Sequence, residues 1–197
     1  MSPYADKEKC ITELWKAEVN NIPLYGYGIK AFTLDMIHSA IKLTKNNITT
    51  EQIKTILGIA KKMLTSPITL LEGAEETLKT LSSRYKIVVA TKGDLLEQEN
   101  KIEKSGLTKY LHHIEVMSEK DKEGYALLMK QLCVEPNEFL MVGNSIKSDI
   151  LPVLELGAQA IYIPSSLTWF YEDGAVKQIK SDRFLQLSKI SEMLNIL

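Results

Sequence analysis

Four polar residues follow short segments that are expected to form strands. The four residues are Thr91, Lys120, Asn144 and Asp149. A threonine hydroxyl, the backbone N–H groups of Thr91 and Lys92, and a lysine ammonium can together neutralise a phosphoryl group. The amide and carboxylate oxygens of Asn144 and Asp149 are the kind of ligand that suits magnesium. If the strands are neighbours in a parallel sheet, one edge of that sheet can hold both groups.

The element that positions Asn144 and Asp149 is the stretch 139–164, with the sequence FLMVGNSIKSDILPVLELGAQAIYIP. Its opening apolar run ends at Gly143, which is typical of a strand buried on both faces of a parallel sheet. An apolar helical face follows Asp149, and Gly157 suits the end of that helix. A second apolar run then ends at Pro164. The stretch is therefore predicted to form a strand-loop-helix-strand unit, with both polar residues at the carboxyl end of its first strand.

The rest of segment 69–197 shows the same alternation. Strands are predicted at 86–90 and 112–117, and helices near 74–81, 95–104 and 121–133. Strands that alternate with helices of this length form right-handed crossovers and a parallel sheet covered on both faces. The fold class is therefore α/β.

Segment 1–68 is predicted to be entirely helical. The first helix, 5–19, carries an apolar stripe expected to face inward, and Pro23 is expected to stop the chain from continuing it. The second helix covers about 29–43. Thr49 and Gln52 form a capping box for a third helix, which Pro67 closes. The expected inward stripe of the first helix consists of Ile11, Leu14, Trp15 and Val19.

Composition narrows the classes of function. The chain has 197 residues, of which 45% are hydrophobic, and its 24 Lys and Arg residues nearly balance 25 Asp and Glu residues. This balance argues against nucleic acid or a membrane surface as partners. The polar N-terminal residues and the lack of a long apolar run predict a cytoplasmic protein. Cys10 and Cys133 are expected to be reduced thiols, and the histidine spacing does not fit zinc.

Three stretches resemble motifs of the haloacid dehalogenase-like (HAD) hydrolases. IVVATKGD resembles the strand ending in Ser or Thr, with Thr91, and SEKDKEGY resembles the lysine motif, with Lys120 as the better match and Lys122 as the fallback. VGNSIKSD resembles the strand ending in GDxxxxD, with Asn144 in place of the first acid and Asp149 as the second. The resemblance covers about 70–165. It implies a HAD-like Rossmannoid parallel sheet at 69–197 and a helical cap at 1–68, similar to the cap that this family inserts between its first two motifs.

The family's opening motif, DxDxT, is absent from this sequence. In the family its first Asp is the nucleophile and its second the general acid and base, and its strand lies in mid-sheet. Asp6 and Asp35 are expected in helical segments and do not replace it. Our hypothesis is that the chain is a shortened form of an enzyme. The resemblance then implies that the intact protein is a magnesium-dependent phosphatase of small phosphorylated metabolites and that this chain alone is inactive or nearly so.

Other interpretations stay open at this stage. Thr91 could cap the next helix, and Lys120 could belong to a solvated helix start. Asn144 suits a turn, and Asp149 a helix N-terminus. A chain with phosphate-binding loops but no nucleophile could also be a non-catalytic module that binds a phosphorylated ligand or a protein. Carbon–halogen hydrolysis, a further activity of the family, needs the same missing Asp. The sequence does not set the oligomeric state.

Overall fold

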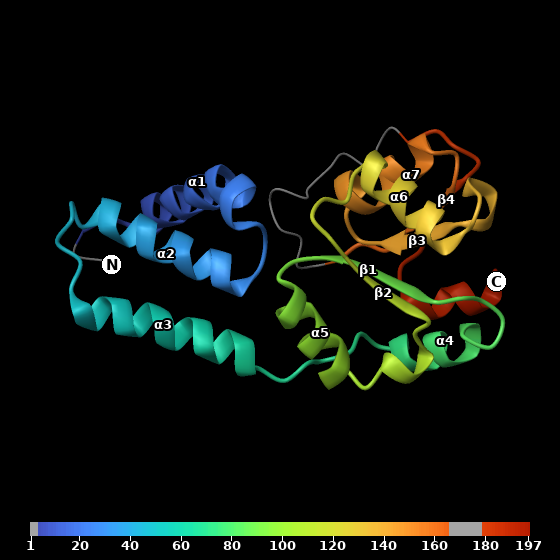
Figure 1. Cartoon of the computed structure of the whole chain (residues 1–197), viewed down its shortest axis with the longest axis horizontal. Helices are drawn as coiled ribbons and strands as arrows, with labels where there is room; N and C mark the ends of the chain where they lie inside the picture. The colour runs from blue at the N-terminus through green and yellow to red at the C-terminus, as the bar shows by residue number, and fades with distance from the viewer. Residues whose placement is uncertain (1–3, 166–178) are drawn as a thin grey trace. The chain divides into compact units, whose positions relative to one another are not determined.

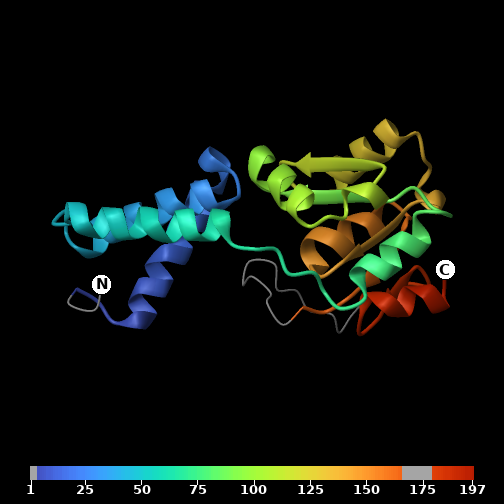
Figure 2. The ribbon, with the colours of Figure 1, turned by 90° about the horizontal axis from the view of Figure 1, so that it is seen from below.

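The computed structural model describes residues 4–165 and 179–197. The chain forms two compact units, one made of residues 1–68 and 92–104 and the other of residues 69–91 and 105–197 (Figure 1). We call them the helical unit and the α/β unit. Residues 92–104, which the sequence analysis placed in the α/β part, cluster with the helical residues. Between α3 and α4 the chain has no helix or strand, as Figure 2 shows.

The described residues of the helical unit form four helices. Their bounds are α1 (Lys7–Tyr25), α2 (Ile29–Leu43), α3 (Thr50–Thr65) and α5 (Leu95–Lys104). The predicted capping box of α3 is confirmed, because the Gln52 backbone N–H donates to Thr49 Oγ1 at 3.2 Å and the Thr49 backbone N–H donates to Gln52 Oε1 at 2.9 Å. Both helix-start donors are thereby satisfied. Among the described residues, no helix is long and apolar enough to cross a membrane.

The prediction that Pro23 lies beyond the end of α1 was wrong. The helix continues to Tyr25 and is capped by Gly26, which has a φ of 67° and donates its N–H to the Ile22 carbonyl. A proline in the last turn removes only one hydrogen bond, and the left-handed conformation at Gly26 is the stronger stop signal.

The predicted inward stripe of α1 was also largely wrong. Ile11, Trp15 and Val19 are between 36% and 45% exposed. The contact of α1 with α2 instead uses small residues such as Ala17 and Ala40, and the Ser39 hydroxyl donates to the Glu13 carbonyl at 3.3 Å. Small side chains allow the two helices to approach closely, and this turns the larger apolar side chains away from the contact.

The early carboxylates have structural roles. Asp6 caps α1 by accepting the Lys9 N–H at 2.8 Å. Asp35 is only 3% exposed and accepts a hydrogen bond from Asn21 Nδ2 at 2.6 Å. The sequence analysis expected both residues in helical segments, and neither lies in a strand.

Glu18 on α1 is a partly buried carboxyl group whose pKa makes stability depend on pH. Burial raises its pKa above the ordinary value of 4.5, and the charge of Asp35 raises it further. In the pH range between 4.5 and the raised pKa, the folded state binds more protons than the unfolded state, so stability falls as pH rises through this range. We expect Glu18→Gln to raise the Tm at pH 7 by roughly 1 °C, and the gain to vanish near pH 4. Thermal unfolding at both pH values checks this, with the exposed Glu99→Gln as a control that should show no such difference.

Residues 92–104 join the helical unit through the turn before α2. Lys30 Nζ contacts Asp94 Oδ2 at 2.6 Å, and this hydrogen bond lowers the pKa of Asp94. The Ile29 N–H donates to Glu97 Oε2 at 2.8 Å. Gly28 makes this approach possible, because its φ is 120° and a Cβ there would lie 3.0 Å from Glu97 Oε2.

The α/β unit alternates strands and helices as predicted. Its helices are α4 (Ala74–Leu81), α6 (Lys122–Leu132) and α7 (Leu151–Glu155), with short 3₁₀ segments at Thr108–Tyr110, Pro136–Glu138 and Ile190–Asn195 and a π-helical turn, η3 (Ile146–Ile150). Its strands are β1 (Val88–Lys92), β2 (His113–Met117), β3 (Leu140–Gly143), β4 (Gln159–Tyr162) and β5 (Phe184–Gln186). The sequence analysis did not predict β5, which is only three residues long.

The described strands form two sheets. In one, β3, β4 and β5 are parallel neighbours in that order, with Gly143 opposite Tyr162 at the carboxyl end. In the other, β1 pairs with β2. The His112 N–H donates to the Ile87 carbonyl at 2.8 Å, just before both strands begin, so β1 and β2 run in the same direction. The described strands thus do not join into one continuous sheet, and the resemblance implies that a mid-sheet strand is missing.

A common core nevertheless connects the two sheets. Tyr125 and Leu128 of α6 are fully or almost fully buried, and they cluster with Met117 of β2 and Met141 of β3. Side chains of β1 pack against the same cluster. The carboxyl ends of β1, β2 and β3 are thus parts of one packed unit.

Candidate active site

The strands β1 and β2 run in the same direction, and their carboxyl ends carry two of the predicted site residues. Thr91 is the fourth residue of β1 and is half-buried. The strand continues to Lys92, two residues past its predicted end. Lys120 follows β2 and immediately precedes Asp121, whose carboxylate caps α6 by accepting the Gly124 N–H at 2.8 Å. The cap fixes the backbone beside Lys120.

Lys120 and Asp149 form the central contact of the site. Lys120 Nζ donates to Asp149 Oδ1 at 2.6 Å, and the two side chains are 12% and 6% exposed. They come from loops that are 29 residues apart in the chain. A carboxylate and an ammonium are buried at such low exposure only when they are paired. The structure therefore brings together two of the residues that the sequence analysis singled out.

The π-helical turn η3 positions Asp149. Ser145 is its N-cap, and the Ser145 N–H donates to Asp149 Oδ2 at 2.9 Å. The Ser145 carbonyl accepts from both Asp149 N–H at 2.8 Å and Ile150 N–H at 3.2 Å. Gly143 provides the space for the carboxylate, because a Cβ there would overlap the Asp149 side chain. Both carboxylate oxygens thus have a fixed donor, one from Lys120 and one from Ser145.

The other predicted site residues lie as follows. Asn144 is exposed in the loop after β3, and Lys122, the fallback lysine, is exposed as the first residue of α6. Lys92 belongs to the helical unit by its contacts, and its Nζ lies 4.5 Å from the centre of the Tyr27 ring. Lys120, and not Lys122, makes the contact with Asp149.

The residues present fit a magnesium ion poorly. Magnesium prefers six oxygen ligands in octahedral geometry. Among the described residues at this edge of the sheet, Asp149 is the one buried carboxylate, and both of its oxygens already accept hydrogen bonds. Among residues 4–165 and 179–197, no group of three or more His, Cys, Asp and Glu side chains could hold a metal. We therefore assign no step of the chemistry to a metal ion.

The sequence analysis missed Ser145 and the role of Gly143. Ser145 supplies a backbone donor to Asp149 and caps the turn through its hydroxyl, which accepts the Ser148 N–H at 2.9 Å. A serine three residues before a second polar residue is a recognisable N-cap signal. Nothing in the sequence indicates that Gly143 must lack a Cβ to admit a carboxylate six residues later.

The fold and the site define an α/β protein with a buried lysine–aspartate pair at the carboxyl edge of parallel strands. The family model of the haloacid dehalogenase-like hydrolases matches residues 7–163. The chain therefore belongs to the haloacid dehalogenase-like hydrolase family. No protein of curated function matches the sequence significantly.

Solved structures show the same fold. A haloacid dehalogenase-like family hydrolase from Xanthomonas campestris is 34% identical, with a TM-score of 0.85, and the match covers 99% of this chain and 77% of that one. An L-2-haloacid dehalogenase from Xanthobacter autotrophicus with chloropropionic acid covalently bound is 11% identical, with a TM-score of 0.66 and coverage of 95% and 83%. A predicted phosphoglycolate phosphatase from Haemophilus somnus is 15% identical, with a TM-score of 0.62 and coverage of 95% and 88%. The last two likenesses concern the fold alone.

Proposed function

We propose that the site of this hydrolase-family chain binds a phosphoryl group, and that its activity in an intact enzyme is the hydrolysis of small phosphorylated metabolites. Thr91 and Lys120 hold the phosphoryl oxygens, with the backbone N–H groups of Thr91 and Lys92 beside them. The sequence predicts Asn144 and Asp149 as magnesium ligands, and phosphate titrations with and without magnesium test that prediction. The sequence holds no DxDxT motif, so this chain alone is expected to be inactive or nearly so.

The observation that carries the proposal is the buried contact between Lys120 and Asp149. An ammonium has three N–H donors, and the contact with Asp149 Oδ1 uses one of them. Asp149 holds the ammonium at the end of β2, while the Ser145 N–H holds Asp149. A cation fixed in this way stabilises negative charge without reorganising when an anion arrives.

Two other functions compete with this one. Carbon–halogen hydrolysis is a second candidate, because the solved dehalogenases have the same fold. The family name and the chloropropionic acid bound in one of those structures support this candidate. A non-catalytic module that binds a phosphorylated ligand or a protein is the third. We favour phosphate because a threonine hydroxyl and a lysine are donors suited to phosphoryl oxygens.

Isothermal titration of the 197-residue chain with inorganic phosphate tests the proposal, and we expect a Kd of roughly 1 mM. Lys120→Met should abolish the binding. Lys122→Met removes a lysine only two residues further along the chain and should retain it. The titrations are run well below the Tm of each variant, so that loss of binding is separated from loss of fold. Repeating them with magnesium present shows whether the ion contributes.

The same series separates the competing functions. Binding of 2-chloropropionate without binding of phosphate would favour carbon–halogen chemistry and contradict the proposal. Phosphate binding without turnover of an aryl phosphate is the expected result for this chain. The chain would instead be active as it stands if it hydrolysed the aryl phosphate in a magnesium-dependent manner and if Thr91→Ala abolished that activity.

A further inference from the structure

Each sheet of the α/β unit has an edge strand that is paired on one side. Among the described strands, β1 pairs with β2 alone, and β3 is the first strand of its sheet and pairs with β4 alone. An edge strand carries a row of backbone N–H and C=O groups with which another chain can pair. The hydrogen bonds that β1 and β3 already make show which backbone groups these are.

In β3 the backbone groups of Leu140 and Val142 form the edge away from β4. Every second residue of a parallel strand bonds the neighbour on one side, and the residues between them point their N–H and C=O groups to the other side. The Gly143 carbonyl accepts the Ile163 N–H at 2.9 Å, on the β4 side. Leu140 and Val142 therefore point their backbone groups away from β4. We call these groups the open edge of β3.

In β1 the backbone groups of Val88 and Ala90 form the corresponding edge. The carbonyl of Ile87, directly before the strand, accepts the His112 N–H at 2.8 Å, on the β2 side. The same alternation points the N–H and C=O groups of Val88 and Ala90 away from β2. We call these groups the open edge of β1.

The side chains of β1 and β3 pack against the same two clusters of buried residues. Val88 and Ala90 of β1 contact the cluster around α6 to which Met141 of β3 belongs. On the opposite face, Ile87 and Val142 contact a second cluster. The two strands therefore belong to one layer that has an apolar core on each face. The buried residues of the second cluster are Leu81, Ile161 and Met193.

The polar side chains of β2 indicate that β2 is the outer strand of its pair. His113 Nε2 lies 3.0 Å from Glu115 Oε2, and the two side chains are 42% and 26% exposed. In both ribbon views β1 lies between β2 and β3 (Figures 1 and 2). Phe184 of β5, at the other end of the second sheet, packs against a third cluster whose described members include no residue of β1. The open edges of β1 and β3 therefore face each other.

The two sheets also have the same strand direction. Lys120 follows β2 and Asp149 follows β3, and the 2.6 Å contact between them places the carboxyl ends of both sheets at one edge of the layer. A strand added between β1 and β3 in this direction would be parallel to both and covered on both faces. Strands of that kind are apolar at nearly every position.

We propose that the α/β unit binds an extended apolar segment of a partner protein as an added strand between β1 and β3. The backbone of the segment bonds both open edges, and its side chains enter both clusters alternately. The segment needs about five residues, because β1 has 5 residues. Addition of a strand to a sheet edge is a recurring mode of peptide recognition. The proposal does not depend on the function assigned to Lys120 and Asp149.

A synthetic peptide tests the proposal with the full chain. The peptide carries a fluorophore and two lysines for solubility, followed by a run of alternating valine and isoleucine of about the length of β1. Fluorescence anisotropy should give a Kd of about 10 μM. The same peptide with proline in the middle of the run lacks one N–H and should bind at least about tenfold more weakly. Equal binding of both peptides would overturn the proposal.

Amide hydrogen exchange of the wild type shows where the peptide bonds. Exchange at Val88, Ala90, Leu140 and Val142 should slow at least about tenfold when the peptide is bound, because their N–H groups form the open edges. The Val89 N–H points to the β2 side and is the internal control, which should change by less than about twofold. Equal slowing at Val89 would contradict the proposal.

The exchange pattern without peptide also tests the proposal. The four open-edge amides should then exchange faster than that of Val89. If they are already as slow, the edges are covered in the free chain and the proposal is wrong. Light scattering then shows whether a second copy covers them, because the chain would have the mass of a dimer.

Val88→Pro is the variant that removes one donor of the open edge. Val88 is the first residue of β1, where a proline is tolerated, and its N–H does not bond β2. The variant should bind the peptide at least about tenfold more weakly. The exchange pattern of the wild type decides the proposal even if this variant does not fold.

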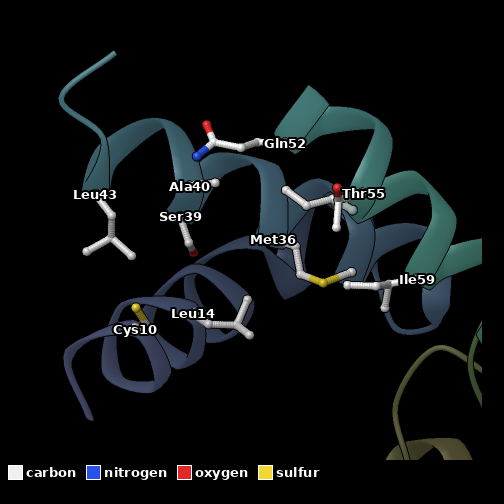
Figure 3. A pocket seen from close by; sticks show the side chains of 10 residues that line it. Cys10, Leu14, Met36, Ser39, Ala40, Leu43, Gln52, Thr55 and Ile59 are labelled. Atoms are coloured by element: carbon white, nitrogen blue, oxygen red, sulfur yellow. The ribbon is translucent and has the colours of Figure 1, made fainter. Parts of the chain in front are cut away.

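Ile59→Lys is the control for peptide binding elsewhere. The helical unit has an apolar groove between α1, α2 and α3, with Ile59 among its lining residues, and an apolar peptide could bind there (Figure 3). Ile59→Lys places a charge in this groove and should leave the Kd of the peptide unchanged. Loss of binding in Ile59→Lys but not in Val88→Pro would place the peptide in the groove and overturn the proposal.

Discussion

Replacing Lys120 by Met should lower the free energy of unfolding by about 3 kcal/mol, because it leaves the Asp149 carboxylate buried without its cation. The two side chains are only 12% and 6% exposed, so solvent cannot replace the lost partner. Methionine has nearly the length of the lysine stem and removes only the charge. Urea denaturation followed by circular dichroism measures the change.

The double variant Lys120→Met/Asp149→Leu distinguishes pairing from packing. If the cost comes from an unpaired charge, removing both charges should recover most of the lost stability. Lys122→Met serves as the control in the same charged segment and should change stability by less than about 0.5 kcal/mol, because Lys122 is exposed. A double variant as unstable as the single one would show that the ion pair is not the cause.

Replacing Gly143 by Ala should cost about 3 kcal/mol and displace Asp149 from Lys120. The added Cβ would overlap the Asp149 carboxylate, which the Ser145 N–H holds in place. Phosphate binding should be lost together with stability, although residue 143 carries no functional group. The free energy of unfolding and a phosphate titration of the same sample test both effects.

Gly58→Ala is the matched control for this substitution. Gly58 lies within α3, and a Cβ there would have no atom within 4 Å. Alanine is the better helix former, so this change should stabilise the helical unit by about 0.5 to 1 kcal/mol. Equal destabilisation by the two variants would mean that the crowding at Asp149 is not responsible.

The order of elements was predictable from sequence because local signals agree with the fold. The Thr49 and Gln52 capping box set the start of α3, and the apolar run before Gly143 set β3. Strand β5 was missed because three residues carry too little periodicity. The helix faces of α1 were misjudged because apolar spacing says which residues share a face and not which face meets the neighbouring helix.

The site was predictable in its residue types but not in its hydrogen bonds. Lys120 and Asp149 were singled out by their places after β2 and β3, and these two meet in the structure. The choice between Lys120 and Lys122 depends on where α6 begins, which the Asp121 cap decides. The donor from Ser145 could not be foreseen, because it arises from a turn in which one carbonyl accepts two N–H groups.

The π-helical turn η3 also limits how chains of this kind can change in length. Asp149 stands four residues after Ser145, which is the spacing of one regular helical turn, and the second N–H that the Ser145 carbonyl accepts, from Ile150, makes the turn π-helical. Deleting Lys147 would rotate everything after it by about 100° and would move Ile150 into the place of Asp149, opposite the ammonium of Lys120. Loss of a single exposed residue would thereby exchange a carboxylate for a hydrocarbon, so this loop should tolerate substitutions at position 147 and reject deletions there.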